Sequence, residues 1–312
     1  MRERRFEFEL YRLNIIDDLD LWTNHLETLR SDEEIVAVLR AATRPEFDWT
    51  SAGEIRRYRW SLRGFQRYDA EGFADVVSLT LARSILEEYG QVVTDEDVVH
   101  GRSESSPPLA ITCELFFFLR RHLVAVERSS SILRSNTWRF AVEDITSAAA
   151  RNGGYRSKIA LEPHPKQDEI IAAFRSFDVL TRLRVHLRLP NPELNRYTRS
   201  LYEDLVSGGI RDYIQDMRNQ DGLNKAEDER PFASAAMAQQ GYKVKEVTLE
   251  GVRDGRREQV ITGRHAARGR VGELREFVRG LKANANTKEG ARVLEAISEE
   301  IERIAPTEDS AA

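Results

Sequence analysis

The stretch LTRLRVHLRL, Leu180 to Leu189, alternates polar and apolar side chains from Arg182 onward. Successive side chains of a β-strand point to opposite faces of a sheet, so the stretch predicts a strand with one apolar and one basic face. We call the basic row the basic ladder, and its members are Arg182, Arg184, His186 and Arg188. Neighbouring members lie about 6.5 to 7 Å apart along such a strand. They repel one another unless an anion or carboxylates face them.

Two interpretations of the basic ladder follow. A nucleic-acid backbone is a polyanion that would satisfy it, which makes the ladder a candidate phosphate-binding face. The alternative is structural: the row is a solvated outer face of a sheet, or it pairs across strands with Glu246 and Glu250 of a later hairpin.

A second basic segment, GVRDGRREQVITGRHAARGR, covers residues 251–270. Its interspersed glycines would let backbone amides approach phosphates closely. Its candidate nucleic-acid-binding residues are Arg256, Arg257, Arg264, Arg268 and Arg270. A hairpin turn followed by an ordinary connection is the alternative interpretation.

Composition limits the remaining possibilities. With 41% hydrophobic and 32% charged residues in 312, the chain can bury a core, and no stretch is apolar enough for a membrane span. We therefore expect a cytoplasmic protein without a membrane span. Cys113 is the single cysteine, so neither an internal disulfide nor a cysteine zinc site can form. The net charge of -5 gives no global basic signature, and nucleic-acid binding would have to rest on local clusters.

The order of predicted elements gives an α+β fold. We predict a β-rich antiparallel domain with flanking helices over 1–153, an α/β domain with the basic strand and a late hairpin over 154–306, and a frayed tail over 307–312. Outside the basic strand, strands are predicted at 4–16, 55–65, 73–86, 111–129 (a hairpin), 157–163 and 242–265 (a hairpin). Helices are predicted at 18–29, 31–43, 131–152, 166–177, 193–219 (one or two helices with a break at Gly208 and Gly209), 232–240 and, as a pair, 272–305. Residues 100–110 and 219–231 are predicted loops, and 157–189 is predicted to form a β-α-β unit.

Enzyme signatures are weak in this sequence. Phosphate-binding, dinucleotide-binding, zinc-protease and hydrolase motifs are absent, and the histidines have no metal-ligand spacing. Glu162, Asp168 and Glu169 loosely resemble the acidic cluster of a metal-dependent nuclease, but acidic residues at the start of a helix also stabilise its dipole. We predict no catalytic residue, no metal site and no cofactor.

Several segments together carry a resemblance: FELYRLNII, ELFFFLRRHLVAVERS, TRLRVHLRLPNP and GYKVKEVTLEGVRDGRREQVITGRH. With these, the chain resembles a prokaryotic domain-of-unknown-function family over most of its length. Its order of elements is also distantly similar to Rex-type phage-exclusion DNA-binding proteins of anti-phage defence systems. That resemblance implies sequence-tolerant DNA binding by a homodimer, and it carries no catalytic motif.

The sequence therefore predicts a non-enzymatic, largely sequence-independent DNA-binding protein of a bacterial defence or phage-exclusion system. DNA is expected in preference to RNA, and a second defence protein is a further candidate partner. A homodimer is expected because two apolar stripes in the C-terminal half must be buried somewhere. The first stripe is Tyr197, Leu201, Leu205, Ile210, Tyr213 and Ile214, and the second is Leu294, Ile297, Ile301 and Ile304. The alternatives are a metal-dependent nuclease effector and a protein-interaction subunit.

Overall fold

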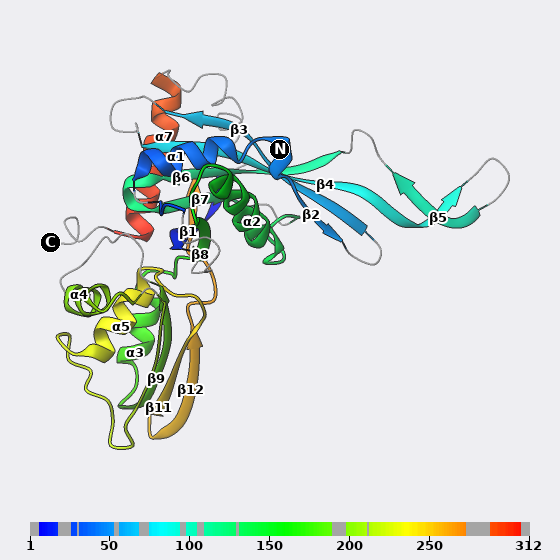
Figure 1. Cartoon of the computed structure of the whole chain (residues 1–312). Helices are drawn as coiled ribbons and strands as arrows, with labels where there is room; N and C mark the ends of the chain where they lie inside the picture. Colours follow the sequence, from blue (N-terminus) through cyan, green and yellow to red (C-terminus); the bar gives the residue numbers. More distant parts are fainter. Residues whose placement is uncertain are drawn as a thin grey trace.

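The protein folds around two separate antiparallel sheets with helices packed on them, which confirms the predicted α+β class (Figure 1). This computed structural model describes residues 6–17, 26–29, 31–52, 56–68, 75–93, 98–104, 109–128, 131–188, 198–210, 212–272 and 288–306. Most of the predicted helix over 18–29 and the first helix of the pair over 272–305 lie outside the described residues. In Figure 1 the two sheets form an upper and a lower lobe.

The larger sheet has nine strands in the order β13-β1-β7-β6-β4-β3-β2, with β5 paired to β4 and β8 paired to β1. Its strands are β1 (Phe6–Asp17), β2 (Trp49–Ala52), β3 (Arg56–Arg67), β4 (Val76–Val93), β5 (Val98–Glu104), β6 (Ala110–Phe118), β7 (Leu123–Glu127), β8 (Ser157–Pro163) and β13 (Arg268–Val271). The predicted β3/β4 pair and β6/β7 hairpin are both confirmed.

Helices cover both faces of the larger sheet. Alternate residues of β6 separate accordingly: Leu115 and Phe117 join one apolar cluster, whereas Phe116 and Phe118 join the other. The first cluster lies under α1 (Asp32–Ala41) and α2 (Thr137–Asn152), and the second lies under α7 (Lys288–Ile304). Because the alternating side chains of these strands face two helical layers, the centre of the sheet is buried on both sides.

The predicted helix after Ser31 begins as expected. The Ser31 hydroxyl accepts a hydrogen bond from the backbone amide of Glu34, and the Glu34 carboxylate accepts one from the backbone amide of Ser31. This reciprocal capping box satisfies two amides that a helix start otherwise leaves without partners.

The strand pair β4/β5 extends beyond the rest of the sheet as a projecting ribbon (Figure 1). Among the described residues, β4 pairs with β3 only as far as Glu88, and from Tyr89 onward it pairs with β5 alone. Residues 98–104 are therefore a strand, and the predicted loop over 100–110 is wrong for its first part. Pro107 and Pro108 indicate that no regular element continues through them, but they do not show where the preceding strand ends.

The smaller sheet has four strands in the order β10-β9-β11-β12. They are β9 (Val179–Arg188), β10 (Asp212–Arg218), β11 (Val247–Arg253) and β12 (Arg256–Thr262). One face packs on α3 (Glu169–Arg175) and α5 (Arg230–Gln239), and α4 (Arg199–Ser207) packs on α5. The predicted basic strand and the β11/β12 hairpin are confirmed. Leu183, Val185 and Leu187 of β9 are fully buried on the helical side.

Strand β10 corrects the helical prediction over 193–219, because among the described residues of that range only α4 is helical. Residues 212–218 instead alternate between exposed and half-buried side chains, with Tyr213 and Met217 against the core. The apolar spacing of this short segment fits both periods, and pairing with β9 selects the strand.

The chain enters the smaller sheet and then returns to the larger one. β8 pairs with β1 rather than with β9, so the predicted β-α-β unit over 157–189 is wrong. β13 also pairs with β1, and α7 packs on the larger sheet. In the sequence, the strands of the smaller sheet therefore lie between two segments that both belong to the lobe of the larger sheet. The predicted domains divide the chain once, at residue 153, whereas β8, β13 and α7 after that point pack with the larger sheet. Local sequence patterns identify strands but not their distant partners.

Candidate nucleic-acid interface

No described helix covers the face of the smaller sheet opposite α3 and α5 (Figure 1), and we call it the open face. The pairing register assigns its side chains, because directly opposed residues of antiparallel strands share a face. They are Asp212, Ile214, Asp216 and Arg218 of β10, Arg182, Arg184, His186 and Arg188 of β9, Thr248, Glu250 and Val252 of β11, and Arg257, Gln259 and Ile261 of β12. The whole basic ladder therefore lies on this face, as the alternation predicts.

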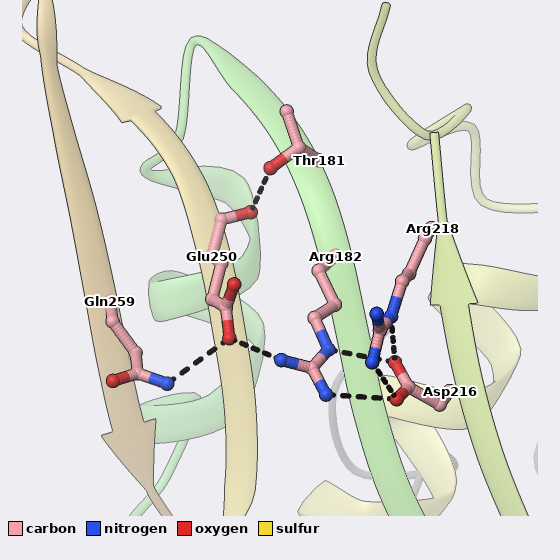
Figure 2. Close-up of polar contacts among 6 residues, drawn as sticks. All are labelled: Thr181, Arg182, Asp216, Arg218, Glu250 and Gln259. Atoms are coloured by element: carbon pink, nitrogen blue, oxygen red, sulfur yellow. Dashed lines mark hydrogen bonds and ion pairs between the residues drawn. The ribbon is translucent and has the colours of Figure 1, made fainter. Parts of the chain in front are cut away.

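A row of polar contacts crosses all four strands of the open face (Figure 2). Arg182 donates from Nε and Nη2 to the two carboxylate oxygens of Asp216, each at 2.8 Å, and from Nη1 to Glu250 at 2.6 Å. Arg218 also binds Asp216, and Gln259 donates to Glu250 at 3.1 Å. Arg182 is therefore held by two carboxylates from two different strands.

This network changes the proton affinities of its members. Hydrogen bonds from Arg182 and then Arg218 hold the pKa of the Asp216 carboxyl well below its usual range. Hydrogen bonds to Asp216 and Glu250 in turn raise the pKa of Arg182. The cross-strand pairing of the ladder with Glu250 is thus observed for Arg182, whereas Glu246 lies 3.8 Å from Arg264.

The other ladder residues differ in how their charge is balanced. His186 binds Asp212 through Nε2, and the Nη1 of Arg188 lies 3.9 Å from a Glu162 oxygen. Arg184 is exposed and has no ion pair among the described residues. Arg184 is therefore the ladder residue most available to an external anion.

The second basic segment is divided by the fold. Arg256 and Arg257 lie on β12, where both are exposed and have no ion pair with the described part of the chain. Arg268 and Arg270 lie instead on β13 of the larger sheet, where they pair with Glu9 and Glu7. These two follow Arg264, which is in the connection between the two sheets. The structure thus brings Arg257 to the face that carries the ladder, and places Arg268 and Arg270 on a different sheet.

The open face has a positive excess and little aromatic character. Five arginines lie on it against three carboxylates, a difference of two positive charges with histidine neutral. Its exposed apolar side chains are Ile214 and Ile261, which are 64% and 62% exposed. No member is aromatic, so the face offers cations for phosphates rather than rings on which bases stack.

Sequence reasoning missed the contribution of β10 to this face. Asp216 and Arg218 reach the ladder only because residues 212–218 form a strand beside β9. The available signal was weak: Tyr213 and Met217 alternate with the charged Asp212, Asp216 and Arg218, but the apolar Ile214 between them interrupts the pattern.

Two of the three acidic residues considered for a nuclease site, Glu162 and Glu169, have other structural roles. One oxygen of Glu169 accepts hydrogen bonds from the Thr262 hydroxyl and the Gly263 amide, both at 2.9 Å. Glu162 is engaged by Arg139 at 3.1 Å. Within the described ranges, no group of three or more His, Cys, Asp or Glu side chains could hold a metal ion. Cys113 is buried in the larger sheet, and burial raises the pKa of its thiol.

The fold and the open face define an α+β protein of two sheets, one of which presents an uncovered, arginine-rich face. The chain belongs to a family described as a domain of unknown function, DUF4747, whose model matches residues 88–264. The matched region includes all of β9 to β12, and with them the open face. No curated protein matches the chain. No helix in the described residues is long and apolar enough to cross a membrane.

Proposed function

We propose that the protein binds a nucleic-acid backbone, DNA in preference to RNA, through the open face. The observation that carries this proposal is the excess of arginine on a sheet face that no described helix covers, with Arg184 and Arg257 exposed and without an ion pair among the described residues. Arginine is suited to phosphate because its planar guanidinium donates two parallel hydrogen bonds.

The arrangement favours backbone contacts over base recognition. Phosphate contacts by arginine supply affinity and little sequence discrimination. The network around Arg182 holds that side chain in the sheet, whereas Arg184 and Arg257 are left to reach outward. The expected binding is therefore independent of sequence and weakens steeply as salt is added.

A role in anti-phage defence remains part of the proposal and rests on the Rex-type resemblance of the sequence alone. The apolar stripes that predicted a homodimer are buried only in part, because Ile210 and Ile214 are 38% and 64% exposed. Leu201, Leu205, Leu294 and Ile297 are all buried inside the chain, against α5 and the larger sheet. A dimer would still increase affinity by placing two open faces on one duplex, but the proposed function does not require it.

The experiment is a binding titration of the full chain with a labelled 20-base-pair duplex at several salt concentrations. Single-stranded DNA, duplex RNA and poly-L-glutamate serve as competitors. Competition by poly-L-glutamate at equal charge concentration would indicate an acidic protein as the partner instead. Absence of duplex binding at low salt would reject the proposal.

A further inference from the structure

A second group of charges lies where the two sheets meet, at the end of β9. Glu162 of β8 is the carboxylate at its centre, and Arg139 of α2, Arg188 of β9 and Lys243 surround it. Lys243 follows α5, and its backbone forms a β-bridge with Leu187 next to Arg188. The group therefore contains side chains from both lobes.

The charges of this group do not balance. Glu162 lies 3.1 Å from Arg139 and 3.9 Å from Arg188, so one carboxylate serves two guanidinium groups. Three cations and one carboxylate leave an excess of two positive charges. The other carboxylates within electrostatic reach of Lys243 have partners of their own, because Glu169 binds Thr262 and Gly263, and Glu246 lies near Arg264.

Lys243 is the most unusual member. It is only 2% exposed, and it has no hydrogen bond or ion pair among the described residues. Its aliphatic part lies against Gly263, where a Cβ would come within 2.9 Å of the Lys243 Cε. Burial lowers the pKa of Lys243 to about 8, so the ammonium group is still mostly protonated at pH 7. A lysine buried this deeply, with no ion pair from the described residues, is costly unless an anion lies beside its ammonium group.

The pKa of a neighbouring histidine is lowered in part by the same positive charges. His164 is buried, and burial lowers its pKa to about 3, with Arg12, Arg121 and Lys243 also lowering it. Cations from several elements therefore act on one small region of the junction.

We propose that Arg139, Arg188 and Lys243 form a binding site for a phosphate-class oxyanion at the junction of the two lobes. Arg188 belongs to both this site and the open face, so a phosphate of a nucleic-acid backbone on that face is one source of the anion. Free inorganic phosphate is the other source. The backbone source rests on the proposed function, and the site itself does not.

The first test is thermal unfolding of the full chain at pH 7 in millimolar sodium phosphate, compared with sodium chloride at equal ionic strength. Phosphate should raise the Tm of the wild type by about 2 °C or more. Lys243→Met should lose this rise. Lys245→Met is the matched control, because Lys245 is an exposed lysine two residues away and should keep the rise.

General stabilisation by phosphate as a salt would raise the Tm of all three proteins equally, and that result would overturn the site. So would the absence of any rise in the wild type. If Lys243→Met does not fold, Arg188→Met replaces it, with broadening of the phosphorus-31 resonance of inorganic phosphate as a direct readout of binding. Broadening by Arg188→Met equal to that by the wild type would also overturn the site.

The second test separates the two sources of the anion. If the site takes a backbone phosphate, Lys243→Met should weaken binding of a 20-base-pair duplex several-fold, and inorganic phosphate should compete with the duplex. If it takes free phosphate, the variant should lose the phosphate effect and bind duplex as the wild type does. Phosphate binding without duplex binding would reject the proposed function and support the oxyanion site. Duplex binding without phosphate binding would reject the oxyanion site and support the proposed function.

Discussion

Arg182 and Asp216 are joined by two parallel hydrogen bonds of 2.8 Å each, across the neighbouring strands β9 and β10. This two-point geometry fixes both side chains, and Arg182 also reaches Glu250 on the opposite side of β9. The pair therefore links three strands through one guanidinium group. Of these two neighbours in the basic ladder, Arg182 is bound to carboxylates of the adjacent strands, whereas Arg184 is exposed.

The first prediction compares these two arginines. Arg182→Ala should lower the Tm more than Arg184→Ala, because it leaves Asp216 and Glu250 without their shared cation. Arg184→Ala removes an exposed charge without an ion pair in the described structure, so its stability should stay within about 0.5 kcal/mol of the wild type. Thermal unfolding of both variants at the same salt concentration checks this order. Equal Tm values would show that the network does not stabilise the sheet.

A second prediction concerns the return of the chain to the larger sheet. A Cβ at Gly269 of β13 would overlap the ring of Phe8 on β1, to which Gly269 is directly paired. Gly269→Ala should therefore destabilise the protein by roughly 1 to 3 kcal/mol, the usual cost of overpacking. Gly272→Ala is the control, since nothing lies within 4 Å of its added Cβ. Urea unfolding measures both, and equal midpoints would contradict the β1/β13 pairing.

The third prediction concerns acid stability. In the folded protein the pKa of His164 is about 3, whereas the pKa of a histidine in the unfolded chain is about 6.5. Between these values the unfolded chain binds a proton that the folded chain does not. The contribution of His164 to stability is therefore complete above about pH 6.5 and falls by about 1.4 kcal/mol per pH unit below it.

Urea unfolding at pH 7, 6, 5 and 4 checks this contribution. The pH dependence of the free energy of unfolding should be shallower in His164→Gln than in the wild type. His265→Gln, at an exposed histidine, should keep the wild-type slope. Identical slopes in all three proteins would mean that His164 takes up its proton in the folded state.

A fourth prediction addresses the nuclease alternative. Glu162 and Glu169 are engaged by Arg139, Thr262 and Gly263. The chain should therefore leave plasmid, linear duplex and RNA intact during incubation with magnesium or manganese. Gel electrophoresis over several hours checks this. Metal-dependent cleavage that disappears in Asp168→Asn or Glu169→Gln would establish the nuclease alternative.

The sequence predicts local structure here better than it predicts partners in space. Strict alternation over 182–189 identifies β9 and its basic face, because this pattern depends only on local sequence. The pairing of β8 and β13 with β1 depends on contacts between residues more than 100 positions apart, which no local pattern records. The candidate sites show the same limit of local sequence patterns. The ladder is visible in the sequence, but the carboxylate of Asp216 and the buried ammonium group of Lys243 reach their places only through the fold.

The most direct test of the central claim is the salt dependence of duplex binding by the wild type and by the double variant Arg184→Ala/Arg257→Ala. A control variant, Arg134→Ala/Arg151→Ala, removes the same charge from exposed positions in the other lobe. The open face predicts binding that weakens as salt rises, with the slope of log affinity against log salt reduced by about two in the first variant and unchanged in the control. Equal slopes and affinities in the two variants would contradict it.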